Sequence, residues 1–241
     1  MIKIFPSKED IYQYAADQLI HIANDAINEK GFFTLALTGG SSPKGLYELL
    51  TEEHYKNQID WSKVYVFWGD ERWVSLDDEL SNAKMSFETL LNHVPVLKEN
   101  IFPMYKEGIR PEDYALEYES ILKEKLGSEG AFDLVLLGMG NDGHTASLFP
   151  GTEVLDEKEK WVSAYYLAPQ EMYRITLTAV LLNQAKQLLV IAFGESKAEA
   201  LEQVIEGESN FSQYPSQLLN PSNGELLFLV DEAAATQLKK K

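Results

Sequence analysis

Five short apolar runs divide the sequence, and none of them alternates apolar with polar residues. A strand with one face in water would show such alternation. Unbroken apolar runs of this length instead indicate strands covered on both faces, as in a parallel sheet packed between helices. The runs are Phe32–Leu37, Val64–Trp68, Phe132–Leu137, Leu188–Phe193 and Leu226–Val230.

Segments with a helical spacing of apolar residues lie between these runs. In Asp10–Glu29, for example, Ile11, Ala15 and Leu19 fall on one face of a helix. Strands that alternate with helices predict the α/β class, with a doubly wound and mainly parallel sheet. The expected helices are Asp10–Glu29, Pro43–Leu50, Asn82–Leu91, Glu112–Leu126, Leu177–Ala185 and Ser196–Ile205.

No internal repeat, low-complexity tract or linker rich in proline and glycine divides the chain. Its 241 residues are enough for one large α/β domain, so we expect residues 1–241 to form a single domain. Two polar stretches, Glu153–Lys160 and Glu206–Asn223, are expected to be surface loops.

Composition excludes several classes of site and location. The sequence has no cysteine, which excludes disulfides and thiolate metal sites. The first residues do not resemble a signal peptide, and no stretch approaches the ~20 apolar residues of a membrane helix, so we expect a cytoplasmic protein. The net charge of −17 disfavours nucleic acid and anionic membranes as partners. A site for an anionic ligand must therefore be locally positive.

Four of the five apolar runs are followed by glycine together with polar or charged residues. In open parallel sheets, ligands bind beyond the carboxyl ends of the strands. These four segments are therefore expected to form one site. They are Thr38–Pro43, Gly69–Arg72, Gly138–Thr145 and Gly194–Lys197.

The first segment contains Gly39, Gly40, Ser41 and Ser42, followed by Pro43. Two glycines permit a tight turn and the close approach of a ligand, and a following helix would present free N–H groups to a phosphate. The alternative is an ordinary strand–turn–helix connection in which a serine caps the helix. The spacing matches neither the Walker loop nor the dinucleotide-binding fingerprint.

Three charged residues, Asp70, Glu71 and Arg72, directly follow the second apolar run. The planar guanidinium of Arg72 donates several hydrogen bonds at once, which suits an anionic or carbonyl oxygen of a ligand. The alternative is a solvated loop in which Arg72 pairs with one of the two carboxylates.

His144 follows the third apolar run in a segment with glycines at 138, 140 and 143. Beside it, Asp142 could fix the imidazole tautomer and increase its basicity. Since an ordinary histidine titrates near neutral pH, we expect His144 to act as a general base. His21, His54 and His93 lack this context, and no two histidines have metal-ligand spacing, so a zinc site is not expected.

Two further basic residues stand near strand ends. Arg174 is expected to precede a helix capped by Thr176 or Thr178, and Lys197 to lie in the first turn of another helix. A cation at a helix N-terminus opposes the helix dipole, which a bound anion would offset. The alternative for Lys197 is a flexible surface side chain.

Taken together, these segments resemble the 6-phosphogluconolactonase family, which is related to the glucosamine-6-phosphate deaminases. The resemblance implies a three-layer, modified Rossmann-like α/β/α fold, no metal or other cofactor, and a place in the oxidative pentose phosphate pathway. The matching stretches are Leu35–Leu50, Val66–Val74 with Ser81-Asn-Ala, Phe132–Gly151 and Arg174–Leu201.

The resemblance also implies roles for single residues. It makes His144 the base with Asp142 beside it, and it places Arg72 on the sugar side of the site. Phosphate is implied to bind Gly39, Gly40, Ser41, Ser42, Arg174 and Lys197. The sequence departs from the family pattern at Tyr173, where proline is expected before the arginine.

The segment after His144 separates the two activities of these relatives. The deaminases continue with Ile-Ala-Phe-Asn-Glu-Pro, whose glutamate supports ring opening, whereas this chain has Thr145-Ala-Ser-Leu-Phe-Pro. The deaminases also have tyrosine where this chain has Arg72. The resemblance thus implies hydrolysis of a phosphosugar lactone, which is the expected small-molecule partner. We expect a monomer. A glucosamine-6-phosphate deaminase and a non-catalytic phosphosugar sensor are the alternatives.

Overall fold

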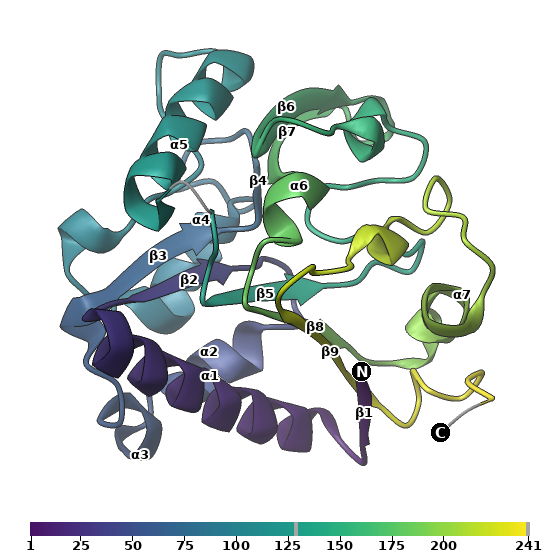
Figure 1. The fold of residues 1–241 in the computed structure, drawn as a ribbon, viewed down its shortest axis with the longest axis horizontal. Helices are drawn as coiled ribbons and strands as arrows, with labels where there is room; N and C mark the ends of the chain where they lie inside the picture. The colour runs from purple at the N-terminus through teal and green to yellow at the C-terminus, as the bar shows by residue number, and fades with distance from the viewer. Residues whose placement is uncertain (128–129, 240–241) are drawn as a thin grey trace.

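A six-stranded parallel sheet forms the centre of the computed structural model, which describes residues 1–127 and 130–239. Its strand order is β1-β9-β8-β5-β2-β3. In Figure 1, α1 and α2 lie below this sheet, and α5 and α6 lie above it. The strands are β1 (Ile2–Phe5), β2 (Phe33–Leu37), β3 (Val64–Trp68), β5 (Leu134–Gly138), β8 (Gln187–Ala192) and β9 (Glu225–Asp231).

The five strands predicted from apolar runs are β2, β3, β5, β8 and β9, and the predicted α/β class is confirmed. Their central residues are almost entirely buried, which explains why no alternation is visible in the sequence. β1 was not predicted because it is an edge strand of four residues, none of them fully buried.

The helices cover both faces of the sheet, and α1 packs against β2 and β9. α1 begins at a Ser7 cap, whose hydroxyl accepts a hydrogen bond from the Asp10 N–H, and it ends at Gly31 with φ of 88°. The helices are α1 (Lys8–Lys30), α2 (Lys44–Leu50), α3 (Glu53–Lys56), α4 (Asn82–Ser86), α5 (Pro111–Leu126), α6 (Ala179–Leu182) and α7 (Ala198–Glu206). The predicted helix 82–91 is confirmed, because α4 continues as a π-helix, η2 (Phe87–Leu91).

The topology brings the glycine-containing strand ends together. The strands β8, β5, β2 and β3 are consecutive neighbours in the sheet, and all of them are parallel. Their carboxyl ends therefore meet at one edge, as expected for a ligand site in an open parallel sheet.

A second sheet of three antiparallel strands, in the order β4-β7-β6, was not predicted. These strands are β4 (Asp70–Arg72), β6 (Val162–Leu167) and β7 (Met172–Leu177). The charged segment 70–72 is therefore a strand and not a loop. Arg174 lies within β7 and not at a helix N-terminus, but the helix expected after it is present as α6.

The helix expected at Leu177–Ala185 is shorter than predicted, and of the two expected caps only Thr178 occupies the N-cap position. Thr176 is part of β7, where its hydroxyl accepts a hydrogen bond from the Ser147 N–H. The hydroxyl of Thr178 donates to the Lys160 carbonyl and therefore makes no capping hydrogen bond to α6.

The two expected surface loops contain short 3₁₀ helices with buried residues. They are η4 (Glu153–Asp156), which buries Val154 and Leu155, and η7 (Pro215–Leu218), which buries Pro215 and Ser216. These two stretches are therefore partly packed against the rest of the protein, which their polar composition did not indicate. Among the described residues, no helix has the length and apolar character needed to cross a membrane.

Candidate active site

A pocket of about 270 Å³ lies at the carboxyl edge of the central sheet, beside the second sheet. Eight of the nine predicted site residues line it, although they come from four separate strand ends and from β7. They are Gly39, Gly40, Ser41, Ser42, Arg72, His144, Arg174 and Lys197. The ninth, Asp142, contacts His144 directly.

The imidazole of His144 is held by Asp142. Nδ1 lies 2.5 Å from the Asp142 Oδ1, and the same oxygen accepts a hydrogen bond of 3.1 Å from the His144 backbone N–H. Beside a carboxylate, Nδ1 carries the proton, which leaves Nε2 as the free basic atom. Burial raises the pKa of Asp142, but its interactions with His144 outweigh this effect and hold the pKa below its usual value. Asp142 therefore stays ionised near neutral pH.

The glycines of this loop leave space for that pair. A Cβ atom at Gly140 would lie 2.1 Å from the His144 Nδ1 and 2.4 Å from the Asp142 Oδ1. The Gly140 N–H also donates a hydrogen bond of 2.8 Å to the His144 carbonyl, which closes the loop. Glycine is therefore required at position 140 by close packing against the base.

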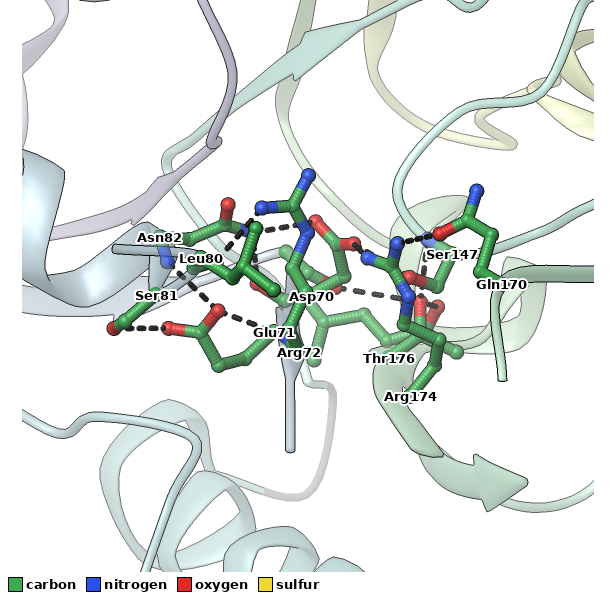
Figure 2. Close-up of polar contacts among 12 residues, drawn as sticks. Asp70, Glu71, Arg72, Leu80, Ser81, Asn82, Ser147, Gln170, Arg174 and Thr176 are labelled. Atoms are coloured by element: carbon green, nitrogen blue, oxygen red, sulfur yellow. Dashed lines mark hydrogen bonds and ion pairs between the residues drawn. The ribbon is translucent and has the colours of Figure 1, made fainter. Parts of the chain in front are cut away.

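Arg72 and Arg174 face each other across the antiparallel pair β4–β7. The alternative in which Arg72 pairs with Asp70 or Glu71 is not seen among the described residues, where Arg174 pairs with Asp70 at 3.8 Å (Figure 2). Arg174 also donates to the Gln170 side chain, and Arg72 donates to the Leu80 carbonyl. The Nε atoms of both arginines are buried, and no described residue accepts a hydrogen bond from them.

The charges around this pocket favour an anionic ligand. Burial lowers the pKa of Arg174, and the neighbouring Arg72 lowers it further, while Asp70 opposes both effects. Like charges directly opposite on paired strands are destabilising. Burial also lowers the pKa of Lys197, a half-buried side chain at the end of η6 (Glu195–Lys197) and directly before α7. Lys197 is therefore at the pocket and not a flexible surface residue.

The turn after β2 has the conformation that its glycines predict, but it contains no serine cap. Gly40 has φ of 82°, and a Cβ at Gly39 would lie 1.8 Å from the Asn82 Oδ1. Pro43 occupies the position before α2, and no side chain caps this helix. The alternative in which Ser41 or Ser42 caps α2 is therefore wrong.

Sequence reasoning assigned no role to several residues of this site. Asp70, Asn82, Phe149 and Gln170 all line the pocket. Asp70 lies in the charged segment with Arg72, and Asn82 lies in the Ser81-Asn-Ala stretch that resembles the family. Their positions in these motifs could have indicated that they belong to the site. Gln170 and Phe149 carried no signal, because their positions depend on the second sheet and the loop after His144. Among the described residues, no group of three acidic or histidine side chains could hold a metal ion.

Glu71 fixes the other side of β4. Its carboxylate is almost fully buried and accepts hydrogen bonds from the N–H groups of Arg72, Asn82 and Ala83, and from the Ser81 hydroxyl (Figure 2). Glu71 therefore joins β4 to the beginning of α4, next to two pocket residues. Burial raises the pKa of Glu71 to about 7 despite these hydrogen bonds.

Comparison with known proteins identifies the family of this chain. The family model for glucosamine-6-phosphate isomerases and 6-phosphogluconolactonases matches residues 6–228. The chain belongs to this family. Two relatives, both called 6-phosphogluconolactonase, come from Synechocystis sp. and Nostoc sp. The first is 39% identical over 89% of this chain and 88% of its own length, and the second is 36% identical over 98% of each chain.

Solved structures of the family share the fold. The 6-phosphogluconolactonase of Leishmania guyanensis is 29% identical, with a TM-score of 0.85 over 100% of this chain and 99% of its own. That of Trypanosoma brucei is 26% identical, with a TM-score of 0.86 over 99% and 98% of the two chains. A monomeric glucosamine-6-phosphate deaminase, 23% identical over 98% of this chain and 99% of its own, has a TM-score of 0.83. This fold therefore carries both activities of the family.

The raised pKa of Glu71 predicts a pH-dependent difference in stability between the wild type and Glu71→Gln. A carboxyl whose pKa is raised on folding stabilises the protein at low pH, and this stabilisation is lost as the pH rises through the folded value. As the pH rises from 4.5, the ordinary pKa of this carboxyl, to about 7, the free energy of unfolding of the wild type should fall relative to that of the variant. The expected loss is on the order of 3 kcal/mol.

Urea unfolding of both proteins at pH 5 and pH 8 measures this difference. The substitution's own effect on packing and hydrogen bonding is the same at both pH values and cancels. If the difference in free energy of unfolding between the two proteins is the same at both pH values, Glu71 is already ionised at pH 5, stabilised by the hydrogen bonds that it accepts.

Proposed function

We propose that this protein hydrolyses 6-phospho-D-glucono-1,5-lactone to 6-phospho-D-gluconate in the oxidative pentose phosphate pathway. The observation that carries the proposal is that one pocket contains both a candidate base and several cations. His144, which is held by Asp142, and the cations Arg72, Arg174 and Lys197 line the same cavity. Membership of the family and the names of the relatives support the same substrate.

The phosphate end of the substrate binds the Gly39–Ser42 turn, Arg174 and Lys197. The turn offers backbone N–H groups and two hydroxyls, and the two cations supply charge within a protein of net charge −17. The buried Nε of Arg174 is a donor without a partner in the described chain, which an anion would satisfy. Binding at this end places the lactone ring against His144.

The chemistry follows from the free Nε2 of His144. Nε2 takes a proton from water as the water oxygen attacks the lactone carbonyl carbon, and Asp142 stabilises the resulting imidazolium. Arg72, or N–H groups of the glycine loops, stabilises the oxyanion that forms. The bond between the carbonyl carbon and the ring oxygen then breaks, and His144 returns its proton to that oxygen. The products are a carboxylic acid, which ionises, and a hydroxyl.

The deaminase alternative receives less support from the site. Thr145 stands directly after the base, and its hydroxyl donates to the Gly138 carbonyl. The carboxylate that lines the pocket within the described residues is Asp70, which is engaged by Arg174 and by the Ser147 hydroxyl at 2.5 Å. Asp70 is therefore poorly suited to the proton transfers of ring opening.

We also infer that the chain acts in the cytoplasm as a single-domain monomer, without a metal or other cofactor. One chain supplies the base, its carboxylate partner and the cations of the pocket, so the proposed reaction does not require a second subunit. Ester hydrolysis by a positioned base needs no redox or group-transfer cofactor.

His144→Gln should lose about 10²- to 10⁴-fold in lactone hydrolysis, because the general base is removed. The measurement is the decay of freshly generated lactone, corrected for spontaneous hydrolysis. His21→Gln is the matched control, since His21 is an exposed residue of α1, and it should retain wild-type activity. Normal turnover by His144→Gln would remove the base assignment. Release of ammonia from glucosamine 6-phosphate, without lactone hydrolysis by the wild type, would favour the deaminase.

Lys197→Ala should raise KM for the lactone about tenfold and leave kcat within about threefold, because the lost contact is to the remote phosphate. Steady-state kinetics measure both constants. Lys63→Ala is the control for loss of one positive charge, since exposed Lys63 precedes β3 at the opposite edge of the sheet. An unchanged KM in Lys197→Ala would exclude Lys197 from the phosphate site.

A further inference from the structure

The ring of Phe149 lies flat against the imidazole of His144. Their centroids are 4.1 Å apart, and the angle between the ring planes is 27°. Phe149 is only 8% exposed, and it lines the pocket. The same ring also lies near the guanidinium of Arg174, whose central carbon is 5.5 Å from the ring centroid. One aromatic side chain therefore contacts both the base and a cation of the anion site.

Asp142 alone does not fix the direction of the His144 Nε2. A single hydrogen bond at Nδ1 leaves the imidazole free to rock about that contact. A flat contact with a second ring restricts this motion, so two contacts together define where Nε2 points. Reaction rates depend steeply on such orientation, and a misplacement of about 1 Å can cost 10²-fold.

Phe149 is itself held by the loop that follows His144. Its carbonyl accepts hydrogen bonds from the Thr152 hydroxyl at 2.6 Å and from the Thr152 N–H at 3.3 Å. Before it, the Leu148 N–H donates to the Thr145 carbonyl, in a turn that places Ala146 at φ of 47°. The backbone that carries the ring is therefore fixed independently of the imidazole.

The contact also suits the charge that develops on the base. His144 becomes positive when it takes a proton from water, and the face of an aromatic ring attracts a cation. Asp142 faces the imidazole at Nδ1, and the charged groups Asp70, Arg72, Arg174 and Lys197 line the same pocket. Because three of these four are cations, a neutral ring face is a favourable neighbour for the imidazolium.

We propose that Phe149 is a positioning residue that orients the His144 imidazole for proton transfer. This inference rests on the proposed lactone hydrolysis. Arg174 remains held by Asp70 and Gln170 without the ring, so Phe149 acts mainly on turnover and not on substrate binding.

Phe149→Leu tests this role because it keeps an apolar side chain and removes the flat face. The expected result is a fall in kcat of about tenfold, with KM within about threefold of the wild type. Phe32→Leu is the matched control, since Phe32 also contacts a cation, Lys30 at 4.4 Å, but lies at the opposite edge of the sheet. This control should retain wild-type kinetics.

An NMR measurement on the wild type reports the stacking without relying on a variant's activity. Protons that face an aromatic ring are shifted upfield, so a His144 ring resonance should lie upfield of its position in free imidazole. Its loss in His144→Gln assigns the signal. In Phe149→Leu, or in Phe149→Met if the leucine variant does not fold, the signal should move towards the free position.

The outcomes separate this inference from the proposed function. An active wild type and an equally active Phe149 variant would overturn the positioning role alone. A raised KM with unchanged kcat in the Phe149 variant would overturn it as well, because it would mean that the Phe149 ring supports substrate binding through Arg174. A His144 resonance that is unshifted in the wild type would show that the rings do not stack. A wild type that does not hydrolyse the lactone would overturn the proposed function and this inference with it.

Discussion

The carboxylate of Asp70 joins the segments that surround the pocket. It extends from β4, accepts a hydrogen bond from Ser147 in the loop after His144, and pairs with Arg174 on β7. The Asn82 side chain at the start of α4 donates to the Asp70 carbonyl at 3.0 Å. A buried cation is tolerated only when it is paired, so Asp70 permits Arg174 to lie beside Arg72. The anion site and the loop that carries the base therefore depend on one buried acidic side chain.

The central sheet was predictable because burial on both faces leaves unbroken apolar runs. The second sheet was not, although β7 did contain a signal. Ile175 and Leu177 alternate with Arg174 and Thr176, but here the polar side chains are buried as well, against Asp70 and Ser147. We expected a helix from Leu177 in this segment and did not recognise the alternation before it as a strand. β4 has only three residues, two of them charged, and no local pattern identifies such a strand.

The residues of the pocket were more predictable than their contacts. Glycine beside His144 and Asp142 at a strand end indicated a base, and the structure places these two side chains in contact. The partner of Arg72 was not predictable, because the choice between Asp70, Glu71 and Leu80 depends on the pairing of β4 with β7. Phe149 lay in the Phe132–Gly151 stretch that resembles the family, but no role was inferred for it. Since the fold is shared with a deaminase, differences in function must arise from side chains such as these.

The central claim is that one pocket holds the phosphate of the substrate at one end and its carbonyl carbon against His144 at the other. A crystal structure with bound 6-phosphogluconate tests this most directly. The account predicts phosphate oxygens within hydrogen-bonding distance of Lys197, Arg174 and the Gly39–Ser42 turn, and the product carboxylate beside the His144 Nε2. A carboxylate bound away from His144, or a phosphate bound next to it, would contradict the account.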